Sequence, residues 1–553
     1  MRIRFSLLTL FLAAMLPSVA QDSTHTPAPM EDVNRVVDLT LDSLNKAASA
    51  RPVPGSSRVD DHPVLFLVGN STMRTGTLGN GNNGQWGWGF FAHQYFDASR
   101  ITVENHALGG TSSRTFYKQL WPAVLGGVRP GDWVLIELGH NDNGPYDSGR
   151  ARASIPGIGT DSLVVTIRET GIVDTVYSYG EYMRRFIRDV RSHGAHPVLC
   201  SLTPRNSWEA DGTVSRKTQS ITLWQQQIAE EMDVPWVDLE GTAARRFETY
   251  GPAKTDYHFY LDRIHSSAYG ARANALSAAE AIAACPGLAL ADYLTPADTW
   301  YPQETVDRVA GRPVVFFCGD STMKNEDRDT PDSMWGWGSV ASALFKKDRV
   351  TVVNAGKAGR SARTYIEEGR WERVYNALQP GDYVVIQFGH NDMGDIAVGK
   401  ARADIPGTAD SSHVYRLQKD ASYQVVYTYG WYLRKMIADA REKGATPIVC
   451  SMTPRNEWPD GHIERRPGTC ATWAAEVAAE MGTPFIDIHN LTADWLDAHA
   501  TSKDTAAPYY QHDHTHTSLL GARLNAAMFA RGLRDTDCPL RKELKRSASK
   551  FNQ

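Results

Sequence analysis

Two serines lie where a protein of parallel strands exposes reactive side chains. Ser71 and Ser321 each follow a run of apolar and aromatic residues, and each stands in a Gly-x-Ser-Thr-Met turn. A turn of small residues at the carboxyl end of a buried strand presents its side chains above the edge of the sheet. A serine hydroxyl is a weak nucleophile until a neighbouring base takes its proton. Both serines are therefore candidate nucleophiles, provided that other segments supply a base and hydrogen-bond donors.

The base and its partner are predicted near the end of each half of the chain. Asp262 stands three residues before His265, and Asp513 stands three residues before His516. A neutral imidazole accepts a proton near pH 7. An aspartate bonded to the other ring nitrogen fixes the tautomer and stabilises the imidazolium ion. The pattern predicts one Ser-His-Asp triad in each half.

Donors for a negatively charged oxygen are predicted from two further loops in each half. Gly110 and Gly359 follow the second strand candidates, and Asn141 and Asn391 follow the third. A tetrahedral intermediate needs donors aimed at its oxyanion, and losing one typically costs roughly 10²–10³ in rate. The serine N–H, the glycine N–H and the asparagine amide would supply three such donors.

These residues recur because the chain contains a long internal repeat. Ser321 and Ser71 are 250 positions apart (321 − 71), and several other stretches recur at the same offset within a residue. Gly-His-Asn-Asp at 139–142 returns at 389–392, and Pro-Val-Leu-Cys-Ser at 197–201 returns as Pro-Ile-Val-Cys-Ser at 447–451. A period of this length indicates two duplicated domains.

Within each copy, short apolar runs alternate with segments of helical pattern. Continuous apolar strands separated by helices indicate a parallel sheet covered on both faces. Each copy is therefore predicted to be a three-layer α/β/α domain with five parallel strands. The strand candidates are 64–68, 101–105, 133–138, 197–201 and 234–238, then 314–318, 350–354, 383–388, 447–451 and 484–488. Helices are predicted over 179–193 and 429–443, each closed by a glycine.

The N-terminus has the pattern of a secretory signal peptide. Arg2 and Arg4 precede an apolar run that is shorter than the ~20 residues needed to span a bilayer, and Ser18-Val19-Ala20 offers a cleavage site. We therefore expect the protein to be secreted or periplasmic. The predicted divisions are a signal peptide (1–20), a leader (21–58), a first domain (59–287), a linker (288–311), a second domain (312–540) and a basic tail (541–553).

Composition excludes several classes of function. A net charge of −5 over 553 residues is nearly balanced, whereas a nucleic-acid-binding surface shows clustered basic charge. We therefore expect no nucleic-acid partner. No segment after the N-terminal run could span a membrane, so we also expect no membrane association. His512, His514 and His516 alternate around Asp513, a pattern that also suits a metal. The first copy has leucine and arginine at two of those positions, so we expect a triad histidine and no metal.

The motifs resemble those of the SGNH, or GDSL-type, hydrolase superfamily, and most closely its rhamnogalacturonan acetylesterase-like branch. The resemblance rests on Gly-Asp-Ser-Thr-Met at 319–323, Ala-Gly-Arg-Ser-Ala at 358–362, Gly-His-Asn-Asp at 389–392 and Asp-His-Thr-His at 513–516. It implies two flavodoxin-like domains with the triads and oxyanion donors named above. It also implies a serine esterase that needs no metal or other cofactor and removes acetyl groups from a plant polysaccharide or oligosaccharide, most closely pectin or rhamnogalacturonan.

Two alternatives stay open at this point. The same scaffold serves lipases and thioesterases, although no long apolar lid segment is apparent. One domain could instead act only as a carbohydrate-binding module, against which stands a complete triad pattern in both copies. The first copy departs from the family pattern at Asn70, where an aspartate is expected, so the activity of that site is the first to test.

Two further features have competing interpretations. Trp86, Trp88 and their counterparts Trp335 and Trp337 could stack on sugar rings, but packing against the sheet is the favoured reading. Arg360, beside the glycine of the second site, could meet a galacturonate carboxylate or could be an ordinary surface charge.

Overall fold

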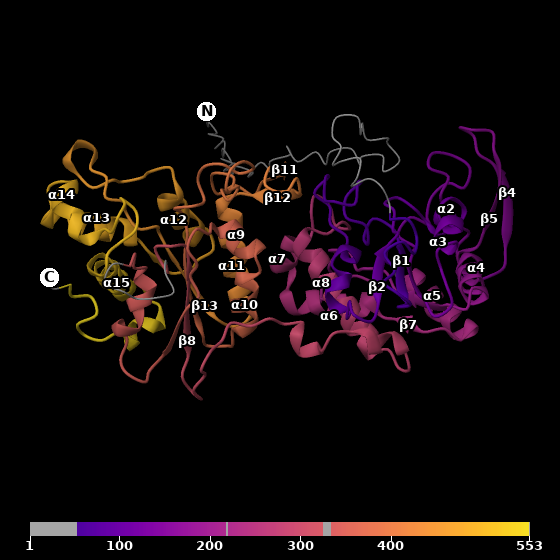
Figure 1. Cartoon of the computed structure of the whole chain (residues 1–553), viewed down its shortest axis with the longest axis horizontal. Helices are drawn as coiled ribbons and strands as arrows, with labels where there is room; N and C mark the ends of the chain where they lie inside the picture. The colour runs from indigo at the N-terminus through magenta and orange to yellow at the C-terminus, as the bar shows by residue number, and fades with distance from the viewer. Residues whose placement is uncertain (1–51, 217–218, 325–332, 552–553) are drawn as a thin grey trace, which may run out of the picture.

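The computed structural model of the chain describes residues 52–216, 219–324 and 333–551. The predicted signal peptide and most of the predicted leader lie outside these residues. The described chain forms two α/β domains side by side (Figure 1). Each is built on a five-stranded sheet in which every neighbouring pair of strands is parallel.

The predicted strands are confirmed in type, number and place. The first sheet has the order β2-β1-β3-β6-β7 and the second β14-β13-β10-β8-β9. The first set is β1 Val64–Gly69, β2 Thr102–Asn105, β3 Trp133–Glu137, β6 His196–Cys200 and β7 Trp236–Val237. The second is β8 Val314–Gly319, β9 Thr351–Asn354, β10 Tyr383–Gln387, β13 Thr446–Cys450 and β14 Phe485–Ile486. The last strand of each sheet has only two residues and lies at its edge.

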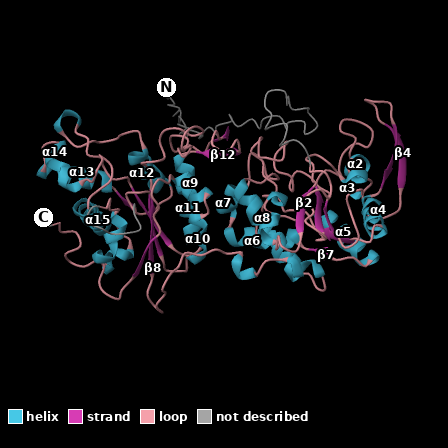
Figure 2. Ribbon diagram, viewed as in Figure 1, coloured by secondary structure: helices cyan, strands magenta, loops and turns pink. Residues whose placement is uncertain are grey.

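Helices cover both faces of each sheet, which gives the predicted three layers (Figure 2). The first domain contains α2 Ser113–Gln119, α3 Trp121–Leu125, α4 Tyr179–Ser192, α5 Gln219–Met232, α6 Leu239–Tyr250, α7 Pro252–Thr255 and α8 Ala268–Ala284. The second contains α9 Ala362–Glu367, α10 Arg370–Ala377, α11 Tyr429–Glu442, α12 Cys470–Glu480, α13 Ile488–His499, α14 Lys503–Ala506 and α15 Leu519–Arg534. The α4 and α11 helices lie where they were predicted.

Alternate residues of a strand pack into two separate hydrophobic cores, one on each face of the sheet. In the first domain Val64, Phe66 and Val68 of β1 face α2 to α5, whereas Leu65 and Leu67 face α6 and α8. All five side chains are buried. This pattern is what a two-faced parallel sheet requires, and it explains why its strands read as continuous apolar runs.

The structure adds two antiparallel hairpins that the strand candidates do not include. They are β4 Ser162–Thr166 with β5 Val173–Tyr177, and β11 Ser412–Arg416 with β12 Tyr423–Tyr427. Each hairpin is inserted between the third strand of its sheet and the long helix that follows. Much of the first hairpin is exposed, so it carries no buried apolar run of the kind by which the sheet strands were identified.

The two domains are joined through a buried polar and aromatic contact. Lys254 of α7 reaches Tyr375 Oη at 2.8 Å and Glu442 Oε2 at 3.2 Å in the second domain. Tyr269 of α8 packs against Trp431 of α11, with ring centroids 5.6 Å apart. Tyr269 belongs to the same core cluster as the second domain's helices, so the two domains share packed interior.

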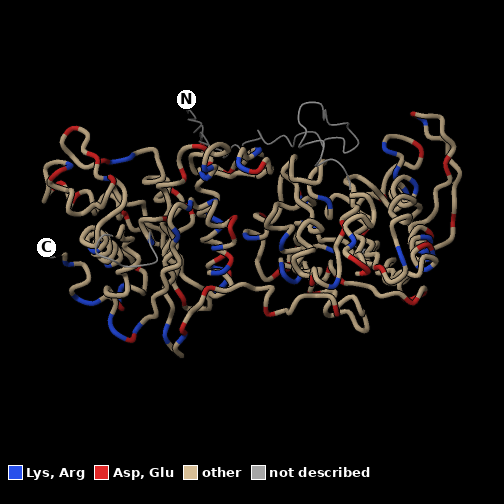
Figure 3. Tube along the Cα trace, viewed as in Figure 1, with Lys and Arg blue, Asp and Glu red and all other residues tan. Residues whose placement is uncertain are grey.

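Residues 288–311, the predicted linker, pack partly on the first domain. Leu288 and Leu290 are buried in its core, and the 3₁₀ helix η5 (Ala289–Tyr293) lies there. All six cysteines are free thiols. Acidic and basic residues are interspersed over both domains (Figure 3). No helix among the described residues is long and apolar enough to cross a membrane.

Candidate active site

The first triad is assembled by hydrogen bonds between residues nearly two hundred positions apart. Ser71 Oγ lies 2.9 Å from His265 Nε2. His265 Nδ1 lies 2.6 Å from Asp262 Oδ2. Because a carboxylate only accepts, we assign the ring proton to Nδ1, which leaves Nε2 free to accept the serine proton. The three side chains can therefore pass a proton from the serine to the imidazole.

The second triad has the same geometry. Ser321 Oγ lies 2.8 Å from His516 Nε2, and His516 Nδ1 lies 2.6 Å from Asp513 Oδ2. The backbone N–H of His516 also donates to Asp513 Oδ1 at 2.7 Å. The structure thus brings together all six residues for which the triads were predicted.

Each aspartate is held by a tightly wound loop. Leu261 and His512, directly before the two aspartates, adopt left-handed φ angles of +64° and +58°. Such angles are uncommon outside glycine and often mark functional sites. The backbone N–H of Asn456 braces the loop by donating to His514 O at 2.7 Å, as Asn206 does to Arg263 O at 2.9 Å. The repeated Thr-Pro-Arg-Asn segments therefore support the triad loops.

The aspartates are held in the charged form that the triad needs. Burial by itself raises the pKa of Asp262, but hydrogen bonds from His265 and from backbone N–H groups outweigh it, and the net pKa is lowered. The pKa of Asp513 is lowered in the same way. Each aspartate therefore faces its imidazole as a carboxylate at neutral pH.

Three donors are available at each predicted oxyanion position. Gly110 and Gly359 have φ angles of +78° and +77°, which favour glycine. Among the described residues, neither these glycines nor Ser71 and Ser321 donate their N–H to another group. Asn141 Nδ2 and Asn391 Nδ2 each donate one hydrogen to a backbone carbonyl, at 2.9 and 3.1 Å, and keep a second.

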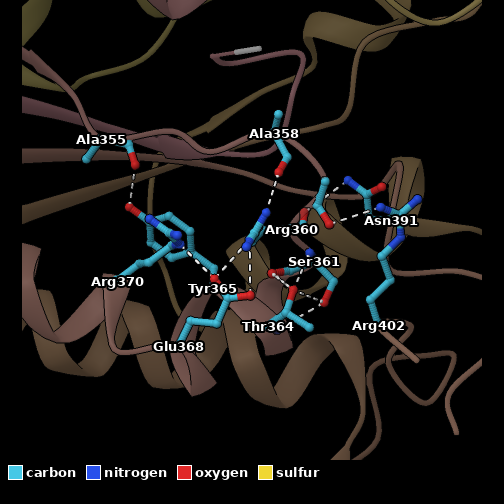
Figure 4. A network of polar contacts seen from close by, with 11 residues as sticks. Ala355, Ala358, Arg360, Ser361, Thr364, Tyr365, Glu368, Arg370, Asn391 and Arg402 are labelled. Carbon is cyan, nitrogen blue, oxygen red and sulfur yellow. Dashed lines mark hydrogen bonds and ion pairs between the residues drawn. The ribbon is translucent and has the colours of Figure 1, made fainter. Parts of the chain in front are cut away.

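An arginine that the sequence analysis did not single out secures each oxyanion glycine. Arg402 Nη1 donates to Gly359 O at 3.1 Å, and Arg152 Nη1 donates to Gly110 O at 2.9 Å. Figure 4 shows Arg402 beside Asn391, next to the loop of Arg360 and Ser361. No signal in one sequence distinguishes these arginines from surface charges, but they occur at the same place in both copies.

Arg360 has a local structural partner. Its Nε lies 2.9 Å from Glu368 Oε2, and its Nη1 donates to Ala358 O at 3.0 Å (Figure 4). These contacts favour the reading of Arg360 as an ordinary surface charge.

The Trp-Gly-Trp-Gly segments are structural in part. Trp88 and Trp337 are buried, whereas Trp86 and Trp335 are half-buried.

The alternating histidines of the second copy are separated in role. His516 joins the triad, and His514 Nε2 lies 3.4 Å from Glu457 Oε1. Among the described residues no group of three or more His, Cys, Asp or Glu side chains is placed to hold a metal ion.

Comparison with known proteins finds the same family in both copies. The model of the GDSL-like lipase/acylhydrolase family matches residues 67–273 and again residues 317–524. The chain is 34% identical over 221 residues to a rhamnogalacturonan acetylesterase of Emericella nidulans, a match that covers 40% of this chain and 84% of that protein. It is 29% identical over 244 residues to the rhamnogalacturonan acetylesterase RhgT of Bacillus subtilis, covering 42% and 93% of the two chains.

Two solved structures each match about two fifths of this chain. Protein YXIM of Bacillus subtilis matches with 25% identity and a TM-score of 0.32, over 40% of this chain and 56% of that one. The acetylxylan esterase Axe2 of Geobacillus stearothermophilus matches with 18% identity and a TM-score of 0.28, over 40% and 94%. These two likenesses carry no functional weight. The family match spans more than half of the chain and includes both nucleophile turns, so this chain belongs to the GDSL-like lipase/acylhydrolase family and hydrolyses carboxylic esters.

Proposed function

We propose that this protein removes O-acetyl groups from a pectic polysaccharide of the rhamnogalacturonan type, using a serine triad in each of its two domains. The observation that carries the proposal is the hydrogen-bonded Ser-His-Asp chain, present with the same geometry in both copies. The substrate class rests on the similarity to rhamnogalacturonan acetylesterases.

The acylation half of the reaction uses two proton transfers through one histidine. Ser71 Oγ attacks the acetyl carbonyl while His265 Nε2 takes the hydroxyl proton, and the carbonyl oxygen becomes an oxyanion. The N–H groups of Ser71 and Gly110 and the Asn141 amide stabilise that charge. The imidazolium then protonates the departing sugar oxygen, leaving an acetyl-serine.

Water completes the cycle at the same site. His265 takes a proton from water as the water oxygen attacks the acetyl-serine, and the collapse of the second intermediate releases acetate and restores the serine hydroxyl. Ser321, His516 and Asp513 perform the same steps in the second domain. The intact triad geometry in both domains argues against a purely carbohydrate-binding role for either one.

The test is acetate release from acetylated rhamnogalacturonan by four proteins: wild type, Ser71→Ala, Ser321→Ala and the double variant. We expect each single variant to retain the activity of the other site and the double variant to lose acetate release. Acetylated xylan and acetylated mannan serve as comparison substrates. Acetate release by the double variant at the wild-type rate would contradict the proposal, and equal rates on all three polysaccharides would contradict its substrate class.

We further propose that the protein is exported through its N-terminal signal. The support is the charged, apolar and small-residue pattern of residues 1–20. The N-terminal sequence of protein recovered outside the cytoplasm should begin at Gln21 or close to it. A protein that retains Met1 would contradict export by cleavage.

A further inference from the structure

Beneath each nucleophile turn lies a buried pair of side chains, one on each of two neighbouring strands. The residue before the serine follows the first strand of the sheet, and its partner ends the adjacent strand. In the first domain the pair is Asn70 and Glu137, and in the second it is Asp320 and Gln387. All four side chains are fully buried. Each pair therefore contains one carboxyl group and one amide, but in exchanged positions.

The register of the sheets makes the two pairs equivalent. Gly69 pairs with Glu137 across β1 and β3, and Gly319 pairs with Gln387 across β8 and β10. A threonine hydroxyl lies between the two members in each case. Thr72 Oγ1 is 3.0 Å from both Asn70 Oδ1 and Glu137 Oε1. Thr322 Oγ1 lies 2.8 Å from Asp320 Oδ1 and 3.1 Å from Gln387 Nε2.

In the second domain the carboxyl group clamps the turn to the neighbouring loop. Asp320 Oδ1 accepts from the backbone N–H of Thr322 at 2.8 Å, and Asp320 Oδ2 accepts from the backbone N–H of His390 at 3.3 Å. Gln387 accepts from the indole of Trp337 at 2.5 Å and donates to the threonine hydroxyl. His390 belongs to the loop that carries the oxyanion asparagine, so Asp320 ties the nucleophile turn to that loop.

In the first domain the carboxyl group on the other strand makes a comparable clamp. Glu137 Oε1 accepts from the backbone N–H of Thr203 at 3.1 Å, and Glu137 Oε2 accepts from the Trp88 indole at 3.0 Å. Thr203 opens the Thr-Pro-Arg-Asn segment that braces the triad loop. Asn70 accepts from the backbone N–H of Thr72 at 3.1 Å, but its buried Nδ2 has no hydrogen-bond partner among the described residues.

We infer that Glu137 is the positioning residue that replaces the missing aspartate at position 70, so that each site keeps one buried carboxyl group under its nucleophile turn. The inference rests on the proposed function and explains how the first site remains complete despite Asn70. Glu137 does not touch the reacting atoms. It acts through Thr72, Trp88 and Thr203, which fix the turn that presents Ser71.

Each buried pair beneath a nucleophile turn accommodates one carboxyl group. With none, the Thr203 N–H loses its carboxyl acceptor, and an amide at position 137 can turn its own N–H toward that donor. A buried N–H that loses its acceptor pays the full cost of leaving water. With two, like charges would share one threonine hydroxyl in a buried site, which forces one group to stay protonated. With Asn70 in the first copy and Gln387 in the second, each pair has one amide and one carboxyl group, so neither problem arises.

The test is a double-substitution cycle in the first site, measured in a Ser321→Ala background. The variants are Glu137→Gln, Asn70→Asp and the two combined. We measure kcat and KM for p-nitrophenyl acetate and the rate at which a fluorophosphonate labels Ser71. Each single variant should lower kcat by ~10-fold or more with KM changed by less than about twofold, because the turn, and not ester binding, is disturbed. The combined variant should recover to within about threefold of the parent, since it reproduces the arrangement of the second site.

A matched substitution separates positioning from general damage. Glu104→Gln removes another buried carboxyl group, on β2, which pairs with His106 at 2.8 Å and not with the nucleophile turn. It should leave kcat at Ser71 within about twofold of the parent. If the combined variant loses the product of the two single losses, the two positions are independent and the inference is wrong.

The same double-substitution cycle can be measured in the second site. It tests the inference even if the first site proves inactive. In a Ser71→Ala background, Asp320→Asn and Gln387→Glu should each lower kcat, and the combination should recover it. If Ser71 in the parent neither hydrolyses esters nor reacts with the fluorophosphonate, the proposed function fails for the first site. The reciprocal cycle then decides the inference, and additive losses there overturn it.

Discussion

At the scale of single residues, the two aspartates of the triads have one clear task. Asp262 and Asp513 are partly exposed, yet each accepts from its histidine ring and from the histidine backbone N–H. Two bonds to one residue fix both the position of the ring and the nitrogen that carries the proton. The carboxylate stabilises the imidazolium ion and can only accept, whereas an amide in its place can donate and reverse the ring tautomer.

Replacing Asp262 by asparagine should therefore reduce kcat with little effect on folding. In a Ser321→Ala background we expect kcat for p-nitrophenyl acetate to fall roughly 10³–10⁴-fold, as the wrong tautomer becomes favoured. Asp147→Asn, which alters an exposed ion pair with Arg168, is the control and should change kcat by less than about twofold. A loss for Asp262→Asn no larger than the control's would remove Asp262 from the triad.

Glu137 also predicts a pH dependence of folding. Burial raises its pKa to about 7, although three hydrogen bonds oppose the rise. The folded state therefore binds this proton more tightly than the unfolded state, so stability is present below about pH 4.5 and is lost as pH rises through about 7. The difference corresponds to about 3 kcal/mol.

Urea unfolding at pH 5 and pH 8 measures this effect. Wild type should lose stability between these values, and Glu137→Gln should lose about 2.5 kcal/mol less over the same interval, since part of the effect falls below pH 5. Glu104→Gln is the control, because hydrogen bonds lower the pKa of Glu104 to about 2 despite its burial, and its titration lies below this window. Equal pH slopes for wild type and Glu137→Gln would contradict the prediction.

At the scale of elements, the helix after each triad histidine sets the position of the triad loop. In the first domain α8 begins at Ala268, three residues after His265, and the side chain of Ser267 caps its first turn. Gly270 lies in that turn directly against the backbone of His258, where an added Cβ would stand 1.9 Å from the carbonyl oxygen. Gly521 meets Tyr509 O at the same distance in the second domain. Glycine is therefore required for contact between helix and loop.

Gly270→Ala should displace α8 from the loop that carries Asp262 and His265. We expect a loss of at least about 3 kcal/mol in folding stability and a loss of labelling at Ser71, with Ser321 still labelled. Gly126→Ala is the matched control, because an added Cβ there meets nothing closer than 3.5 Å. Thermal unfolding measures the change in stability, and fluorophosphonate labelling measures the reactivity of Ser71 and Ser321. Retained labelling at Ser71 with unchanged stability would show that the contact can relax.

At the scale of the whole molecule, corresponding parts of the two copies have different surroundings. In the first copy Val164 and Val173 of the β4–β5 hairpin are exposed. In the second copy their counterparts Val414 and Tyr423 are half-buried, and Val414 packs on the core that Tyr260 and Tyr269 of the first domain share. The repeat is thus asymmetric in space, because the second domain's hairpin and helices meet the first domain's α7 and α8.

Lys254 is the charged centre of this contact. Its side chain is 5% exposed and lies 3.5 Å from Asp439 Oδ1 and 3.2 Å from Glu442 Oε2. Lys254→Met should cost about 3–5 kcal/mol at the interface, because it leaves buried acidic groups without this partner. Scanning calorimetry should then separate the unfolding of the two domains. Arg168→Ala, at an exposed ion pair, should change stability by no more than about 1 kcal/mol, and an unaltered trace for Lys254→Met would contradict a rigid interface.

The sequence by itself determined the duplicated α/β architecture and the residues of both triads. Buried parallel strands leave continuous apolar runs, and residues at their carboxyl ends must meet at one edge, so Ser71 and His265 could be paired without coordinates. Exposed hairpins such as β4–β5 leave no such run and were missed.

Only the tertiary structure decided which polar residues act together beneath and beside the site. Asn70 looked like a loss of charge in the sequence, because its partner Glu137 lies 67 positions away (137 − 70) on a neighbouring strand. Arg152 and Arg402 were not singled out in the sequence for the same reason, since the glycines that they contact lie about 40 positions away, at separations of 42 and 43. A difference of a few tenths of an ångström decides whether such a hydrogen bond forms. Only the packing of strands and loops sets the positions of the two atoms that closely.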